Sequence, residues 1–82
     1  MKNLSKKALN ELFRRLLEDA KGDIRRFAKE NNRTSAMLCY GKICGYTDVM
    51  RKLELIDWEQ SRFIQDEAFA LAQGKEPEYE AC

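Results

Sequence analysis

The sequence predicts an all-α protein, a compact three-helix bundle with a long amphipathic first helix. Only seven of the 82 residues are Val, Ile or Thr, whereas 47 are Ala, Leu, Glu, Lys, Arg, Gln or Met, which favour helix. No alternation of apolar and polar residues is long enough to predict a strand, and apolar residues recur instead at helical spacings. This length suits one domain, which we assign to residues 1–74, followed by an acidic tail over residues 75–82 that we expect to be mobile.

The first helix is expected to run from residue 5 to about residue 31, with Ser5 as its N-cap. Its apolar positions form one face of a 3.6-residue period: Leu9, Leu12, Phe13, Leu16, Leu17, Ala20, Ile24, Phe27 and Ala28. Gly22 interrupts this series, so a break there with Asp23 as a new cap is the alternative. The unbroken phase favours one long helix, which Asn31 and Asn32 end because Asn tolerates the left-handed conformation.

Thr34 or Ser35 is expected to cap the second helix, which is expected to run to about Leu53. Its apolar residues cover more than one face, which predicts the most buried helix: Met37, Leu38, Tyr40, Ile43, Cys44, Tyr46, Val49, Met50 and Leu53. Gly41 and Gly45 are four residues apart on this helix. Since glycine weakens a helix, their spacing indicates a ridge where another helix approaches closely.

The third helix is expected to begin after Asp57, beyond a corner at Leu55 and Ile56. Asp57 and Gln60 have the spacing of a capping box, and Gly74 is a suitable stop after the helix. The predicted buried stripe consists of Phe63, Ile64, Ala68, Leu71 and Ala72.

Charge is nearly balanced in total but uneven along the chain. Fifteen cations and 14 anions give a net charge of +1. Residues 1–33 carry a net charge of +5, residues 34–53 of +2 and residues 54–82 of −6. A basic first third and an acidic last third indicate packing within the chain, charge-matched pairing between chains, or two different binding surfaces.

The residue types argue against catalysis. Histidine is absent, which removes the commonest general base and the commonest metal ligand. Cys39 and Cys44 would lie roughly 140° apart around a helix, which does not suit joint metal ligation. No glycine-rich phosphate-binding loop is present, because Gly41 and Gly45 lie within a helix. We therefore expect no enzyme, no catalytic residue, no metal and no cofactor.

Cysteine usage and hydropathy predict a cytoplasmic protein. The three cysteines are an odd number without a C-x-x-C pair, which is typical of a reducing compartment. Charged residues interrupt residues 1–17, so we expect no secretory signal. No apolar run approaches the roughly 20 residues of a membrane span, so we expect no membrane partner.

One stretch resembles a helix-turn-helix. In residues 24–46, Ala28 takes the small position of the first helix, Asn32 replaces the turn glycine, and Leu38 falls in the core of the second helix. That second helix is apolar, however, and lacks the side chains that read base edges. The resemblance implies a nucleic-acid-binding transcriptional regulator, the alternative function, in which Arg25, Lys29 and Arg33 would bind phosphates.

The favoured interpretation is a module that binds another protein. The apolar surface exceeds what three short helices can bury, and Arg and aromatic side chains often dominate the energy of interfaces. The candidate interface or packing residues are Gly41, Gly45, Tyr46, Trp58 and Phe69. We expect a symmetric homodimer that buries the first helix or the glycine ridge.

A second resemblance covers residues 41–72. Gly41, Ile43 and Gly45, followed by the corner of residues 53–59 (LELIDWE), are similar to a pattern in short helical accessory proteins of phages and plasmids. This resemblance implies a regulator or inhibitor of a host system that acts by binding a protein complex, as anti-CRISPR and anti-restriction proteins do. It implies no individual functional residue.

Overall fold

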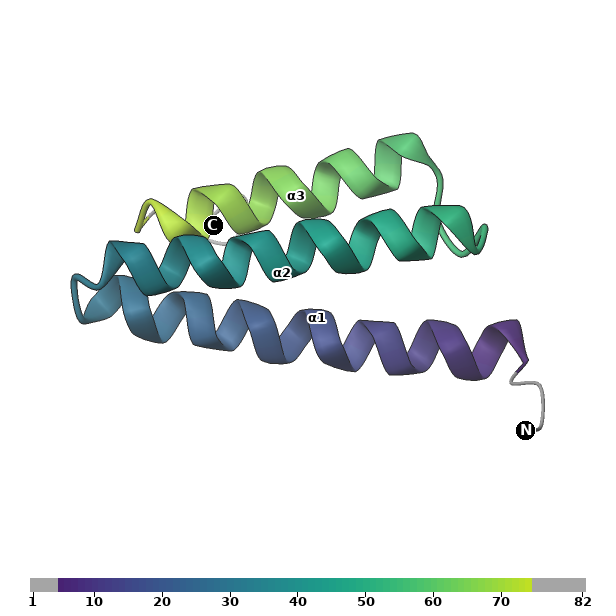
Figure 1. Cartoon of the computed structure of the whole chain (residues 1–82), viewed down its shortest axis with the longest axis horizontal. Helices are drawn as coiled ribbons and strands as arrows, with labels where there is room; N and C mark the ends of the chain where they lie inside the picture. Colours follow the sequence, from purple (N-terminus) through teal and green to yellow (C-terminus); the bar gives the residue numbers. More distant parts are fainter. Residues whose placement is uncertain (1–4, 75–82) are drawn as a thin grey trace, which may run out of the picture.

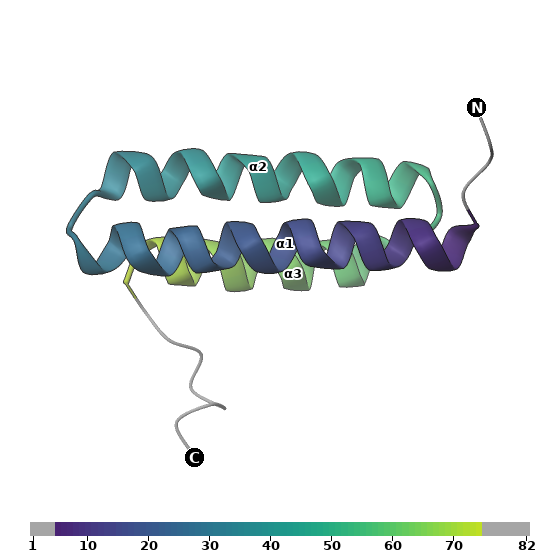
Figure 2. The same ribbon diagram turned by 90° about the horizontal axis from the view of Figure 1, so that it is seen from below.

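The computed structural model describes residues 5–74, which form three α-helices and contain no strand. Helices α1 (Lys6–Lys29), α2 (Arg33–Lys52) and α3 (Trp58–Ala72) run side by side in alternating directions (Figure 1). Each helix contacts the other two, and α2 lies on one side of α1 and α3 (Figure 2). The predicted all-α three-helix bundle is therefore confirmed, whereas the proposed tail, residues 75–82, lies outside the described residues.

The first helix has the predicted extent. The Ala8 N–H donates a hydrogen bond to Ser5 Oγ at 3.1 Å, so Ser5 is the N-cap. The helix passes Gly22 without a break, and Asn31 adopts the left-handed conformation with φ +59° just beyond its end. The one-helix interpretation of this segment is confirmed.

The N-cap of α2 differs from the prediction. Asn32 caps this helix, because its side-chain oxygen accepts a hydrogen bond from the Ser35 N–H at 3.2 Å. Assigning the cap to Thr34 or Ser35 was therefore wrong. The left-handed turn at Asn31 reverses the chain at once, so α2 begins earlier than expected.

The start of α3 confirms the capping box. Asp57 Oδ1 accepts from the Gln60 N–H at 2.8 Å, and Gln60 Oε1 accepts from the Asp57 N–H at 2.9 Å. Gly74 has φ +79°, which agrees with its predicted place after the helix.

The buried core consists mainly of small and medium-sized side chains. Its members are Leu17, Ala20, Ile24, Ala36, Cys39, Ile43, Met50, Ala68, Leu71 and Ala72. Half of them are Ala or Cys, which leaves little apolar volume inside. More large apolar side chains are exposed than are buried in this cluster: Leu12, Leu38, Val49, Leu53, Trp58, Phe63 and Phe69.

The predicted buried stripe of α3 was wrong at Phe63, which is 59% exposed. The buried face of this helix centres on Ser61 and Ala68, both nearly inaccessible to solvent. Phe63 is five residues from Ala68, so its side chain points roughly 140° away from that face. A bulky aromatic residue is therefore left at the surface.

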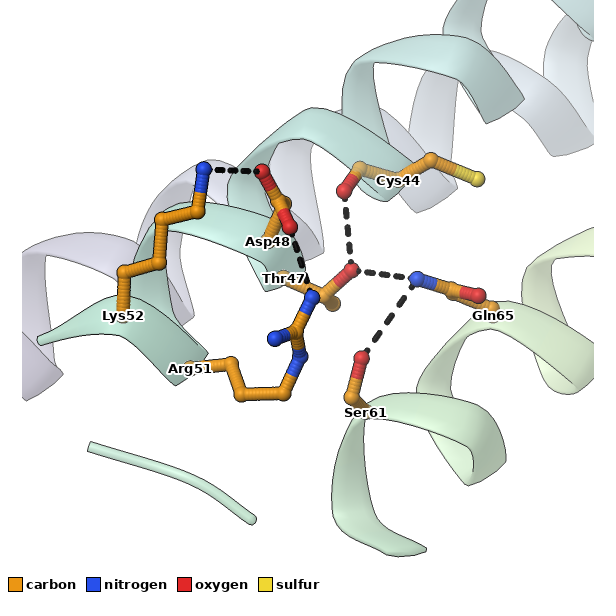
Figure 3. Close-up of polar contacts among 7 residues, drawn as sticks. All are labelled: Cys44, Thr47, Asp48, Arg51, Lys52, Ser61 and Gln65. Atoms are coloured by element: carbon orange, nitrogen blue, oxygen red, sulfur yellow. Dashed lines mark hydrogen bonds and ion pairs between the residues drawn. The ribbon is translucent and has the colours of Figure 1, made fainter. Parts of the chain in front are cut away.

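A polar contact lies inside the interface between α2 and α3 (Figure 3). Thr47 is fully buried, and its hydroxyl donates to the Cys44 carbonyl at 3.0 Å. Gln65 Nε2 donates to Thr47 Oγ1 at 2.8 Å and to Ser61 Oγ at 3.4 Å. Because buried polar groups need partners, these bonds favour one alignment of α3 along α2.

No helix of residues 5–74 combines the length and the apolar character needed to cross a membrane.

Within residues 5–74, no other helix packs against the glycine ridge. Gly41 and Gly45 are exposed, and no atom lies within 4 Å of the position that a Cβ would occupy on either. Ile43 and Thr47 define the buried face of α2, so residues two positions away point outward. The helix that was predicted to approach these glycines is therefore not α1 or α3, and an approach by a second copy stays a prediction.

Replacing exposed helical glycines with alanine should stabilise the protein. Gly22→Ala, Gly41→Ala and Gly45→Ala each add a Cβ in open space, and each should raise the free energy of unfolding by about 1 kcal/mol. Thermal unfolding followed by circular dichroism should show Tm rising by about 4–8 °C. Gly74→Ala is the contrasting control and should lower Tm because of its positive φ. An unchanged Tm in the three helical variants would contradict the exposure of these glycines in the structure.

Candidate protein-binding surface

Among residues 5–74, the most exposed aromatic side chain is held in place by an arginine. Trp58 begins α3 and is 71% exposed, and the guanidinium carbon of Arg51 lies 3.9 Å from its ring centroid. Arg51 Nη2 also forms an ion pair with Asp48 Oδ1 at 2.7 Å (Figure 3), and Lys52 Nζ lies 3.3 Å from Asp48 Oδ2. These contacts orient Arg51, and Arg51 in turn supports one face of the indole.

A second supported aromatic side chain, Phe69, lies at the other end of the interface between α2 and α3. Phe69 is 45% exposed, and its ring meets that of Tyr40 edge-on, with centroids 5.5 Å apart. Tyr40 is half-buried and packs against the core, so it supports the Phe69 ring on the side that faces the core. Edge-to-face pairs of this kind add about 0.5–1.5 kcal/mol beyond burial.

These two pairs define what we call the α2–α3 seam: Tyr40, Arg51, Trp58 and Phe69. The Thr47–Gln65 hydrogen bond lies between its two ends and joins the helices there. Trp58 and Phe69, both predicted interface residues, are eleven residues apart on α3 and therefore share one face of that helix. The antiparallel course of α2 (Figure 1) sets Arg51 and Tyr40 beside them. The seam offers two supported aromatic side chains.

Tyr40 also interacts with a cysteine. A hydrogen bond with the Cys44 side chain and, to a lesser extent, burial raise the pKa of the Tyr40 phenol above its ordinary value of 10.0. The folded protein therefore holds the phenol proton more tightly than the unfolded chain does. The resulting stabilisation is complete below about pH 10 and disappears as the pH rises through the folded-state pKa.

Removing the Tyr40 hydroxyl should reduce the loss of stability in alkali. Between about pH 9 and 11, the free energy of unfolding should fall less steeply for Tyr40→Phe than for the wild type, because phenylalanine has no proton to lose. Urea unfolding at several pH values measures both slopes. Equal slopes would show that ionisation of Tyr40 is not coupled to folding.

The remaining predicted interface aromatic, Tyr46, lies elsewhere. It is half-buried between α2 and α1, where its ring centroid is 6.4 Å from that of Phe13. Tyr46 therefore packs at the edge of the core, whereas Gly41 and Gly45 lie on the outer face of α2. None of these three residues belongs to the α2–α3 seam.

The three cations of the alternative function are divided between two helices. Arg25 and Lys29 are four residues apart on α1, whereas Arg33 is the first residue of α2. Lys29 and Arg33 are exposed, and Arg25 is partly buried. All three lie towards the same end of the bundle, but no single helix carries the complete basic stripe.

The segment that resembles a helix-turn-helix has a different geometry. α1 and α2 lie antiparallel along their length (Figure 1), whereas helix-turn-helix motifs cross at about 90–120°. Leu38, placed in the core of the second helix by that resemblance, is 68% exposed. The structure thus offers no recognition helix projecting from this corner.

No set of three or more Cys, Asp or Glu side chains within residues 5–74 is placed to hold a metal ion. Cys39 is buried in the core, and the partly buried Cys44 interacts with Tyr40.

Sequence reasoning did not identify Arg51 as part of the seam. Arg51 is seven residues before Trp58, with the corner of residues 53–57 between them. Only the reversal of the chain brings the guanidinium over the indole, and local periodicity carries no signal for such a contact. The i, i+3 spacing of Asp48 and Arg51 is typical of an ion pair on a helix, and this was the signal in the sequence that could have drawn attention to Arg51.

A three-helix bundle with an exposed aromatic seam is the class of protein that this geometry defines. No protein-family model, curated protein or solved structure matches the chain.

Proposed function

We propose that this protein acts without catalysis by binding another protein through the α2–α3 seam. The observation that carries the proposal is Trp58, which is largely exposed yet held in place by Arg51. Trp, Tyr and Arg are the residues that most often dominate binding energy at interfaces. A side chain that is ordered before binding loses less conformational entropy when the partner arrives.

The biological role that we propose is a regulator or inhibitor of a host system, of the kind that phages and plasmids carry. The resemblance of residues 41–72 to such accessory proteins, anti-CRISPR proteins among them, supports this role. The partner is then a protein complex in the cytoplasm, and binding itself blocks or redirects its activity.

Affinity capture from host-cell lysate with seam variants tests the proposal. The tagged wild type should retain a stoichiometric protein that survives nuclease treatment, and mass spectrometry identifies it. With that purified partner, Trp58→Ala should weaken binding about 30-fold or more. Trp58 is mostly exposed, so this variant should keep the wild-type circular dichroism spectrum.

Leu38→Ala is the matched control, because Leu38 is similarly exposed but lies on α2 outside the seam. It should bind the partner with wild-type affinity. If Trp58→Ala and the control bind equally well, the seam is not the binding surface.

Nucleic-acid binding is the alternative, and the exposure of Lys29 and Arg33 near one end of the bundle favours it. In that case the wild type should retain nucleic acid, and captured proteins should disappear after nuclease treatment. Replacing Arg25, Lys29 and Arg33 together with Glu should then abolish retention while the fold stays intact.

The predicted homodimer is also part of this proposal. Small buried residues and large exposed apolar residues together indicate that association supplements a limited core. No atom of the described residues lies within 4 Å of a Cβ placed on Gly41 or Gly45, so the glycine ridge is open to a second copy, as is the exposed side of α1.

A further inference from the structure

A groove of about 620 Å³ lies between α1 and α3, and six of its eleven lining residues are polar or charged. Leu17, Met50, Ile56 and Ile64 form its floor. Phe63, the aromatic side chain that α3 leaves largely exposed, stands on its rim. An open apolar floor beside an exposed phenylalanine indicates a surface that another molecule covers.

A buried ion pair fixes how the two walls of the groove align. Lys21 Nζ on α1 lies 2.7 Å from Glu67 Oε1 on α3, and both side chains are mostly buried, with 16% and 14% exposed. This contact places Lys21 and Glu67 at about the same height along the axis of the bundle. Because α1 and α3 run in the same direction (Figure 1), positions equally far before these two residues are also level.

Opposite charges face one another across the groove at such positions. Arg14 is seven residues before Lys21 and Glu59 is eight residues before Glu67, so their levels differ by about one helical rise of 1.5 Å. Both line the groove and both are exposed. Neither forms an ion pair with another residue in the range 5–74.

The charges of the two walls differ overall in the same sense. Of the charged side chains that line the groove, α1 contributes Arg14, Lys21 and Glu18, a net charge of +1, whereas α3 contributes Glu59. A molecule that pairs with this surface must therefore present anions to α1 and cations to α3. A second copy of the chain meets that requirement when its α3 faces α1 and its α1 faces α3.

We propose that a second copy of this chain covers the groove, related by a two-fold axis parallel to the helices. Rotation about such an axis sets α1 of each copy against α3 of the other, and it leaves every residue at the same height along the bundle. Arg14 then meets Glu59 of the second copy, and the reciprocal contact forms as well. Each Phe63 reaches the floor of the opposite groove. This inference rests on the proposed homodimer and names its surface.

The opposite choice of axis fits the charges less well. A two-fold axis across the helices would set α1 against α1 of the second copy. Arg14 would then face a helix that carries an excess of cations. Like charges in an interface cost free energy, so the parallel arrangement is favoured despite its aligned helix dipoles.

Sedimentation equilibrium of the full chain tests the arrangement by exchanging charges. The wild type should be a dimer that weakens as salt is added, because Arg14 and Glu59 are solvent-exposed at the rim. Arg14→Glu and Glu59→Arg should each weaken the dimer about tenfold or more. An equimolar mixture of these two variants should restore dimers, because every charge contact between unlike variants is then attractive.

Two matched controls complete the test. Lys42→Glu makes the same charge change as Arg14→Glu on α2, away from the groove, and should leave the dimer unchanged. Phe63→Asp should abolish the dimer, whereas Leu38→Asp on the outer face of α2 should not. Circular dichroism of each variant confirms that the fold is retained.

Each result has a definite meaning. A monomeric wild type would overturn both the homodimer and its proposed surface. A dimer that resists the charge reversals but is lost with Leu38→Asp would keep the homodimer and overturn the groove. Trp58 lies outside the groove lining, so binding of a different protein to the seam can succeed or fail independently.

Discussion

Ile43→Ala should leave the protein largely unfolded at room temperature. Ile43 is fully buried at the centre of α2 and is among the largest side chains in the core. Its truncation should cost about 2–5 kcal/mol, from lost transfer free energy and from the cavity left behind. A core of this size rarely supplies more than about 3–5 kcal/mol of stability, so one such loss removes most of it.

Urea and thermal unfolding followed by circular dichroism measure this effect. Leu38→Ala on the same helix is the control, because Leu38 is mostly exposed and should change stability by less than about 0.5 kcal/mol. Both variants must be compared at one protein concentration, since dimerisation stabilises the folded state. A small and similar loss for the two variants would contradict the placement of Ile43 in the core.

Thr47→Val should destabilise the protein by about 1–3 kcal/mol although it preserves volume. The Thr47 hydroxyl is fully buried and accepts the 2.8 Å hydrogen bond from Gln65. Valine would remove this acceptor, so one N–H of the Gln65 amide would lose its partner while the longer 3.4 Å hydrogen bond to Ser61 Oγ remains. Leaving a polar group unpaired costs more than the net gain of the original bond.

A second substitution separates this mechanism from a packing defect. Gln65→Leu in the Thr47→Val background should recover part of the stability, because it removes the unpaired amide. Thr34→Val is the exposed control on the same helix and should stay within about 0.5 kcal/mol of the wild type. Chemical unfolding of the single and double variants gives the coupling free energy. Additive losses would contradict the proposed role of the hydrogen bond.

Helix type and most helix ends could be predicted from sequence because local interactions decide them. Ser5 and the Asp57–Gln60 box satisfy N–H groups within four residues, and the unbroken phase through Gly22 belongs to one helix. The error at the start of α2 arose among neighbouring candidates, where Asn32 formed the cap instead. Such choices alter a boundary by one or two residues and leave the fold unchanged.

The candidate sites were less predictable, because they form between helices. Trp58 and Phe69 were identified by residue type, but their supports, Arg51 and Tyr40, come from a different helix. Phe63 was expected in the core and instead borders the groove. Sequence periodicity says which residues share a face, but it does not say how wide a face the neighbouring helices cover.

The sequence by itself therefore determined a bundle of three helices, their order, most of their ends and the uneven distribution of charge. The tertiary structure alone decided that Gly41 and Gly45 face solvent, that Arg51 supports Trp58, and that Arg14 and Glu59 line the same groove. The physical reason is one of range. Capping and helix propensity act within about one turn, whereas burial and charge pairing depend on which residues three packed helices bring together.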